Sequence, residues 1–245
     1  MSAEPPITDQ HVAEIAGIDA GDYWWYAVRR AHVDDQLWAE GDAREAHYLD
    51  LGCGAGGLLD HALRRHAPRR AFGLDGTRRA VEIARARGLD VALHDFAQPL
   101  ALPFAPDRVT CLDVLEHLDD PVLALRSLRR AVAPGAALVV TVPAMPSLWS
   151  AWDELSGHRR RYTRALLREH LGAGGWHVAR VRAFFGYCVP PAWVQRRVLR
   201  TVQEFEFPRV SPLVNRVMTL AGHLERRLGS PLPFGTSLIA TARPA

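Results

Sequence analysis

The sequence of 245 residues contains no lysine, so all 30 of its basic side chains are arginines. The arginines are scattered over segments of helical periodicity without interleaved aromatic residues, and the formal net charge is only +3. A nucleic-acid-binding surface usually concentrates positive charge on one face. The observed distribution instead favours arginines on a solvated surface, and we expect no nucleic-acid partner.

Cysteine is also scarce. Cys53, Cys111 and Cys188 have no metal-ligand spacing, and any disulfide would leave one of them unpaired. Although the chain has 11 histidines, it has no His-Glu-x-x-His motif and no close cluster of His, Asp and Glu along the sequence. We therefore expect no metal site, and a reducing, cytoplasmic compartment.

No apolar run approaches the roughly 18 residues that a membrane-spanning helix needs. The first ten residues lack the basic start and apolar core of a signal peptide, so we expect neither export by that route nor stable insertion in a membrane. Hydrophobic residues nevertheless make up 48% of the chain and charged residues 23%. This composition is typical of a globular enzyme.

From residue 48 onward, short apolar segments alternate with amphipathic ones, which is typical of a parallel sheet covered by helices. The pattern predicts an α/β fold, with a Rossmann-like, seven-stranded, mostly parallel sheet and helices on both faces. The expected strands are residues 46–51, 71–75, 89–95, 108–113, 136–143, 176–185 and 236–244.

The chain is expected to form one domain with four parts. Residues 1–45 are a helical cover, 46–185 the cofactor-binding core, 186–235 a helical cap, and 236–245 the terminal strand. The cap is predicted because about fifty residues of helical periodicity are too many for a plain connection. Its helices are apolar on one face and arginine-rich on the other, which favours a pair that covers the fold over docking to a membrane.

Residues 48–59, YLDLGCGAGGLL, contain two overlapping glycine patterns after the first strand. Gly52, Gly54 and Gly57 fit the G-x-G-x-x-G turn of dinucleotide-binding proteins, whereas Gly52, Gly54 and Gly56 fit a tighter G-x-G-x-G. Either pattern lets the backbone approach a ligand closely at the start of a helix. We expect Gly56 to admit the ligand and Gly57 to let the helix pack close to the sheet.

Acidic residues at the strand ends help to choose between these patterns. Asp50, inside the first strand, would repel a pyrophosphate and attract an ammonium group. Asp75 follows the second strand and can accept both hydroxyls of a ribose. Asp95 and Phe96 follow the third strand and offer an acceptor and an aromatic face to adenine. These residues favour an adenosine ligand with an amino-acid tail over a nicotinamide dinucleotide.

Five segments in order resemble the motifs of class I S-adenosylmethionine-dependent methyltransferases: residues 48–57, 72–85, 93–121, 128–143 and 235–244. The resemblance implies that S-adenosylmethionine is the cofactor, that S-adenosylhomocysteine is its product, and that no metal is required. The implied cofactor-binding residues are Asp50, Gly52, Gly54, Gly56, Asp75, Gly76, Asp95, Phe96, Asp113 and Val114. Gly76 stands where a bulkier side chain often packs on adenine.

An aromatic N-terminal segment resembles a helix that covers the cofactor in some of these enzymes. It would contribute Tyr23, Trp24, Tyr26 and Arg29, with Arg29 pairing with the methionine carboxylate. Packing of the tryptophans in the core is the alternative.

Two histidines are candidates for a general base in methyl transfer. His117 follows the fourth strand beside the expected sulfonium site, and its usual pKa suits proton transfer; capping or packing of the next helix is the alternative role. His158 lies in a predicted lid after the fifth strand. The lid residues expected to bind the acceptor are Trp149, Trp152, Arg160 and Tyr162, unless the tryptophans pack in a core and the arginine is solvated.

We therefore predict methyl transfer to an oxygen or nitrogen of a small molecule. A sugar or lipid-linked glycan is the alternative acceptor, and the sequence leaves the oligomeric state open. A nicotinamide-dependent oxidoreductase and a noncatalytic cofactor-binding module are the alternative classes of protein.

Overall fold

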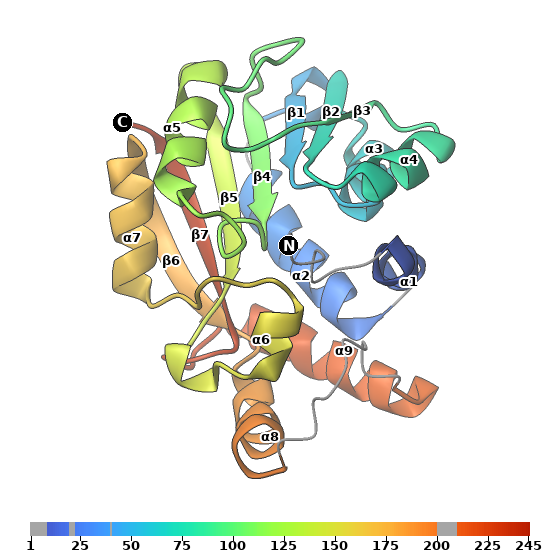
Figure 1. The fold of residues 1–245 in the computed structure, drawn as a ribbon, viewed down its shortest axis with the longest axis vertical. Helices are drawn as coiled ribbons and strands as arrows, with labels where there is room; N and C mark the ends of the chain where they lie inside the picture. The colour runs from blue at the N-terminus through green and yellow to red at the C-terminus, as the bar shows by residue number, and fades with distance from the viewer. Residues whose placement is uncertain (1–8, 20–22, 40, 200–209) are drawn as a thin grey trace, which may run out of the picture.

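A single sheet organises the computed structural model, which describes residues 9–19, 23–39, 41–199 and 210–245. Its strand order is β3-β2-β1-β4-β5-β7-β6 (Figure 1). The strands are β1 His47–Leu51, β2 Arg70–Asp75, β3 Val91–Leu93, β4 Arg108–Leu112, β5 Ala137–Pro143, β6 Trp176–Phe184 and β7 Ser237–Pro244. The predicted fold class is confirmed.

The first five strands pair in parallel, and β7 lies antiparallel between β5 and β6. The chain moves outward from β1 to β3 and then returns to place β4 on the other side of β1. The strand order therefore reverses between β1 and β4. In open α/β sheets this is the point where the carboxyl ends of the strands leave a crevice for a ligand.

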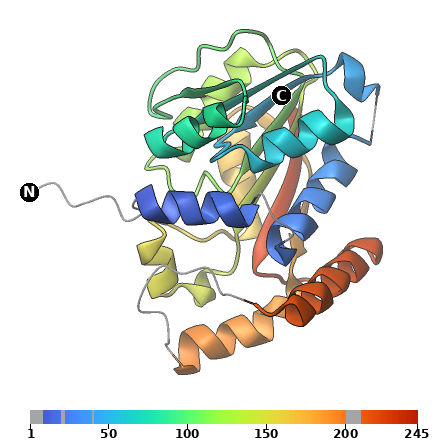
Figure 2. The same ribbon diagram turned by 90° about the vertical axis from the view of Figure 1, so that its right-hand side faces the viewer.

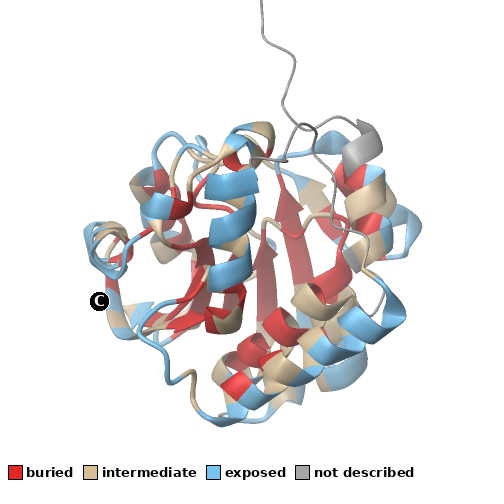
Figure 3. Ribbon diagram, turned by 90° about the horizontal axis from the view of Figure 1, so that it is seen from below, coloured by how far each residue is buried: buried red, intermediate tan, exposed pale blue. Residues whose placement is uncertain are grey.

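Helices cover both faces of the sheet (Figures 2 and 3). They are α1 Asp9–Asp19, α2 Trp24–Leu37, α3 Gly57–His66, α4 Arg78–Ala86, α5 Pro121–Ala131, α6 Ala151–Leu155, α7 Arg164–Ala173, α8 Val189–Trp193 and α9 Pro212–Arg227. Because strand side chains alternate between faces, neighbouring residues enter different cores. Tyr48 and Leu112 join the core under α2 and α3, whereas Leu49 and Cys111 join the core under α5 and α7.

Two residues of the local sequence account for the start of α5. The Asp120 carboxylate accepts a hydrogen bond from the Leu123 backbone N–H at 2.9 Å, and Pro121 occupies the first turn of α5. This cap satisfies a donor that would otherwise be left unpaired at the helix start.

Helix α9 packs against α2 beyond the carboxyl edge of the sheet, on the side toward which the β4 arrow points in Figure 1. A Cβ atom on Gly222 would lie 2.5 Å from a methyl carbon of Val28, so the two helices approach too closely for any larger residue. The buried Glu225 carboxylate accepts hydrogen bonds from the backbone of Phe185 and Gly186 at 2.9 and 2.8 Å. The packed face of α9 thus combines small and polar residues with Met218, which is packed against the core under α2 and α3.

The apolar side chains of α9 lie on its opposite, solvent-facing side. They are Leu213, Val217, Leu220, Leu224 and Leu228, between 54% and 72% exposed. The expectation that the apolar face of the cap would cover the fold is therefore wrong for this helix. Within the part of the chain that the structure describes, no helix has the length and apolar content to cross a membrane.

Candidate active site

The glycine turn that follows β1 is held by the backbone of β2. Gly52, Gly54 and Gly56 have φ angles of 77°, 54° and 86°, a region that glycine enters without steric cost. The Leu74 carbonyl accepts hydrogen bonds from the N–H groups of Gly52 at 2.7 Å and Cys53 at 2.9 Å. The turn therefore has one fixed path at the carboxyl edge of the sheet.

The three glycines face different surroundings. A Cβ atom on Gly52 would lie 2.1 Å from Val114 Cγ2, and one on Gly56 would lie 2.2 Å from Leu89 Cδ1. A Cβ atom on Gly54 would have no heavy atom within 4 Å. The expectation that Gly56 admits the ligand is thus corrected: Gly56 permits packing against Leu89, and Gly54 borders the open space.

Asp75 joins the turn to the next strand and helix. One carboxylate oxygen accepts a hydrogen bond from Gly54 N–H at 2.7 Å, and the other accepts one from Thr77 N–H at 2.8 Å. Burial raises the pKa of Asp75, and these two backbone donors oppose that effect. Each oxygen retains a lone pair for a ligand donor.

Asp50 is buried in β1 and belongs to a chain of hydrogen bonds. The Thr110 hydroxyl donates to Asp50 Oδ1 at 2.6 Å and lies 2.7 Å from the Tyr48 hydroxyl. The burial and the Asp50 charge both raise the pKa of Tyr48, which therefore stays protonated. This network holds the Asp50 carboxylate in one orientation under the turn.

Arg29 of α2 reaches the end of β4 and pairs with Asp113, with 2.5 Å between Nη1 and Oδ2. The Thr141 hydroxyl donates to the same oxygen at 3.1 Å. Asp113 has a φ of 54°, which is uncommon outside glycine and is found preferentially at functional sites. Arg29 was expected to pair with a ligand carboxylate, and the structure pairs it with a protein carboxylate instead. The Arg29 guanidinium also lies 4.4 Å from the ring centre of Trp25.

The aromatic residues of α2 pack chiefly against the end of β6. Trp24 meets Phe185 edge to face at 5.4 Å between ring centres, and its backbone N–H donates to Asn215 of α9. Tyr26 is buried beside Trp25, and Tyr23 contacts both Trp24 and Tyr26. These contacts support the alternative of core packing for Trp24.

Asp95 and Phe96 lie in the turn after β3, opposite Gly76. The Asp95 carboxylate accepts a hydrogen bond from Ala97 N–H at 3.0 Å. A Cβ atom on Gly76 would lie 3.8 Å from the Phe96 ring, which is ordinary contact. Gly76 and Phe96 therefore face each other at this end of the site.

The two histidines predicted as base candidates lie side by side, with 4.9 Å between ring centres. His158 Nδ1 lies 3.0 Å from the Asp153 carboxylate. Burial and the neighbouring His158 charge lower the pKa of His117 to about 4. His117 is therefore neutral at physiological pH.

Asp153 is a functional candidate that the sequence reasoning did not select. Its fully buried carboxylate also receives Arg161 at 2.7 Å and Arg196 at 3.0 Å. Although burial raises the pKa of Asp153, the hydrogen bond with His158 and the arginine charges bring it down to about 2. The Ser150-x-x-Asp153 capping box of α6 was the available signal.

Two predicted acceptor-binding residues have structural roles instead. Tyr162 is fully buried and its hydroxyl donates to the Leu115 carbonyl at 3.2 Å, so it cannot touch an acceptor. The Arg160 guanidinium donates to the carbonyls of Leu118 at 2.7 Å and Asp119 at 3.2 Å. Both side chains secure the loop after β4. Trp149 and Trp152 remain partly exposed on the lid.

Histidines and acids that are distant in sequence come together at two places among the described residues. One group is Glu116, His117 and His158, and the other is Asp34, His61 and His66, each with its potential ligand atoms within 4.8 Å of one another. Glu116 is fully buried, and burial followed by the Asp113 charge raises its pKa well above the usual value. The expectation of no close cluster, drawn from sequence spacing, therefore does not hold in space.

Comparison with known proteins agrees with this fold. A ubiquinone biosynthesis O-methyltransferase of Alkalilimnicola ehrlichii is 31% identical over 146 residues, which cover 53% of this chain and 58% of that protein. The matched region spans about half the length of the curated relatives.

Two solved structures share the fold. An S-adenosylmethionine-dependent methyltransferase from Mesorhizobium loti has a TM-score of 0.59 at 18% identity, and the match covers 93% of this chain and 100% of that one. A Haemonchus contortus phosphoethanolamine N-methyltransferase, in complex with S-adenosyl-L-methionine, has a TM-score of 0.63 at 14% identity, covering 98% of this chain and 58% of that one.

The fold and these comparisons define a class I S-adenosylmethionine-dependent methyltransferase. The profile of the methyltransferase domain matches residues 22–182. The chain belongs to this methyltransferase family, and the predicted enzyme class and cofactor are confirmed.

Alanine at Gly52 and at Gly54 should have different effects. Both substitutions place a side chain at positive φ, which costs roughly 1–2 kcal/mol. Gly52→Ala should lose further stability because its Cβ would collide with the stiff Val114 side chain. Gly54→Ala should mainly weaken S-adenosylhomocysteine binding, because its methyl group enters the open space. Urea unfolding and calorimetric titration measure the two effects, and an equal loss of stability with unchanged binding in Gly54→Ala would contradict the assignment.

Proposed function

We propose that this enzyme transfers the methyl group of S-adenosylmethionine to an oxygen or nitrogen of a small molecule, with His158 as the general base. The observation that carries the proposal is that two groups of functional side chains follow the carboxyl ends of strands of the same sheet. The glycine turn with Asp75 forms the first, and the Asp153–His158 pair beside His117 forms the second.

The residues of the first group fit the cofactor. Gly54 leaves room for a ligand, the Asp75 carboxylate can accept a hydrogen bond from the ribose, and Asp50 adds negative charge near the turn. A positively charged amino-acid nucleoside suits this potential, whereas the phosphates of a dinucleotide would be repelled. We assign adenine to the turn after β3, where the Asp95 carboxylate and the Phe96 ring offer an acceptor and an aromatic face.

The cofactor supplies an activated methyl group on a sulfonium ion. Methyl transfer to an acceptor oxygen or nitrogen would break the carbon–sulfur bond and leave its electron pair on the sulfur of S-adenosylhomocysteine. The acceptor then loses its proton to His158 Nε2. The Asp153 carboxylate lies 3.0 Å from Nδ1 of the same ring, which favours a proton on Nδ1 and leaves Nε2 unprotonated, and the ring centre lies 4.9 Å from that of His117.

His158 suits this role better than His117. A general base works best with a pKa near the working pH, and burial holds the pKa of His117 at about 4. Neutral His117 is then placed to orient the acceptor through a hydrogen bond. Trp149 and Trp152 are assigned to the apolar wall of the acceptor pocket because they extend from the same short lid.

Ligand specificity provides the first test. S-adenosylmethionine or S-adenosylhomocysteine at 100 times its dissociation constant should stabilise the protein by about 2.7 kcal/mol, and NAD should have no effect. Asp75→Asn should abolish the shift, whereas the exposed-site control Asp90→Asn should retain it. A thermal-shift panel measures these effects, and stabilisation by NAD alone would contradict the proposed cofactor site.

The base assignment is tested by His158→Ala and His158→Gln. Loss of a general base should lower kcat by roughly 10²- to 10⁴-fold while cofactor affinity stays constant. Radiolabelled methyl transfer to a panel of phenols and amines measures turnover, with the exposed β6 residue His177→Ala as the matched control. Full activity in both His158 variants would remove His158 from the mechanism.

A lipid-borne acceptor is a second candidate, favoured by the exposed apolar stripe of α9. Leu213, Val217, Leu220, Leu224 and Leu228 recur at three- and four-residue intervals and cover one side of the helix. Burial of such a stripe normally drives a helix onto the protein core. Here the stripe is turned to solvent, so an apolar partner is expected to cover it.

The residues around the stripe favour an anionic lipid surface as that partner. Arg216 and Arg227 are exposed on α9, and its acidic residue Glu225 is buried in hydrogen bonds to the protein. Arginines beside an apolar stripe are typical of helices that lie in a membrane interface. Members of the family that act in ubiquinone biosynthesis match this chain, which supports an acceptor with an apolar tail.

Vesicle binding tests this second candidate. Wild-type protein should sediment with vesicles of phosphatidylglycerol and phosphatidylcholine, and the double variant Leu220→Glu/Leu224→Glu should lose most of that binding. Leu123→Glu, at an exposed leucine of α5, is the matched control. Equal sedimentation of all three proteins would contradict membrane docking through α9.

A further inference from the structure

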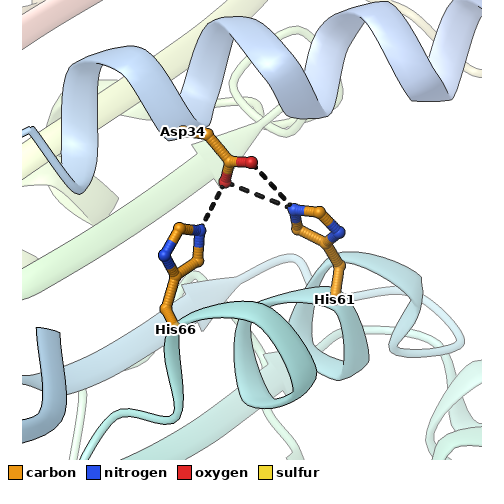
Figure 4. Close-up of side chains that lie close together, drawn as sticks. All are labelled: Asp34, His61 and His66. Carbon is orange, nitrogen blue, oxygen red and sulfur yellow. Dashed lines mark hydrogen bonds and ion pairs between the residues drawn. The ribbon is translucent and has the colours of Figure 1, made fainter.

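Three side chains from two helices converge outside the candidate active site. Asp34 extends from α2 toward His61 and His66 of α3, and both imidazole rings turn their Nε2 atoms toward its carboxylate (Figure 4). His66 Nε2 lies 2.8 Å from Asp34 Oδ1, and His61 Nε2 lies 3.0 Å from Oδ2. All three residues are half-buried at the helix interface.

This set of donors is suited to a transition-metal ion. Two imidazole nitrogens and one carboxylate are ligands of Zn²⁺, with bonds of about 2.0–2.2 Å and a fourth position left for water. Tetrahedral bonds of that length put ligand atoms about 3.3 Å apart. The nitrogen–oxygen distances are 2.8 and 3.0 Å, and all three potential ligand atoms lie within 4.8 Å of one another.

Two neighbouring side chains, Trp38 and Arg65, also affect how well this group could bind a cation. The Trp38 ring stacks on His66 at 4.5 Å between ring centres and an angle of 10°, which restrains that imidazole. The positive charge of Arg65 would oppose the binding of a cation, because its Nε lies 3.5 Å from Asp34 Oδ2. Its side chain is 66% exposed, so it can turn into water when an ion takes the carboxylate.

We propose that Asp34, His61 and His66 bind a divalent transition-metal ion that clamps α2 to α3. Helix α3 begins at the glycine turn, and α2 carries Arg29 to Asp113. An ion between these helices would hold the cover against the cofactor-binding core. If S-adenosylhomocysteine binds at the site given under the proposed function, on which this step rests, the clamp would slow its exit.

Metal binding is measured on the untagged full-length chain with Co²⁺ absorption and Zn²⁺ titration. We expect one site whose visible Co²⁺ bands and Zn²⁺ affinity are lost in His61→Ala and in His66→Ala. Loss of even an outer partner weakens metal sites about 10- to 100-fold, so loss of a ligand should cost at least that much. His177→Ala should retain the site, and so should His158→Ala, which disrupts the other histidine-containing group.

Folding of each variant is checked by its melting temperature in a chelator, which should stay close to that of the wild type. Zn²⁺ should then raise the melting temperature of the wild type and not of the His61 variant. No Co²⁺ bands in the wild type, or bands lost only in His158→Ala, would overturn the metal site.

The clamp is tested by the dissociation rate of S-adenosylhomocysteine in Zn²⁺ and in chelator. A slower rate with Zn²⁺ in the wild type, and an unchanged rate in His61→Ala, would support it. Zn²⁺ binding with equal rates in the wild type would overturn the clamp. Failure to bind S-adenosylhomocysteine would instead contradict the proposed function, while the spectroscopic test of the metal site would stand.

Discussion

The hydrogen bonds of the Asp75 carboxylate fix the geometry on which the cofactor site depends. One oxygen holds Gly54 in the turn after β1, and the other holds Thr77 at the start of α4. Two crossovers of the sheet are thereby tied together at one side chain. The turn contains three residues at positive φ, and a loop of this kind needs external bonds to keep a single path.

The placement of the strand-end residues around this turn is largely predictable from sequence. Strand ends are marked by apolar runs, and parallel strands bring their carboxyl ends to a common edge. Asp50, Asp75 and Asp113 therefore lie at the same edge of the sheet, as their positions at the ends of three predicted strands indicate. The sequence pattern does not show in which direction a Cβ atom at each glycine would point. Gly56 and Gly54 look equivalent in sequence, and only the position of Leu89 separates them.

The acceptor half was predicted less well because it depends on contacts between segments that do not share a sheet. The histidines were found by residue type and by their place after a strand. Arg160 and Tyr162 were misassigned because backbone carbonyls of the loop after β4 bind them. The pairing of Arg29 with Asp113 joins residues 84 positions apart. No local signal specifies such a pair.

The buried carboxylate of Asp153 is neutralised by basic side chains, and these ion pairs also join separate segments of the chain. Two arginines and His158 surround its carboxylate, and these partners offset the cost of removing the charge from water. Arg196 belongs to the segment that follows α8, so the same carboxylate connects the cap to the lid. The position of the His158 ring, which contacts Asp153, is therefore linked to the placement of the cap.

Helix α2 connects the remaining parts of the molecule. It packs on α9 where Gly222 meets Val28, it faces α3 through Asp34, and it contributes Arg29 to Asp113. Protein interiors are close-packed and resist compression. A shift of α9, whose apolar side is turned to solvent, must therefore be accommodated by α2. Because Arg29 is on α2, this helix connects α9 of the cap with the end of β4 through its packing contacts and one ion pair.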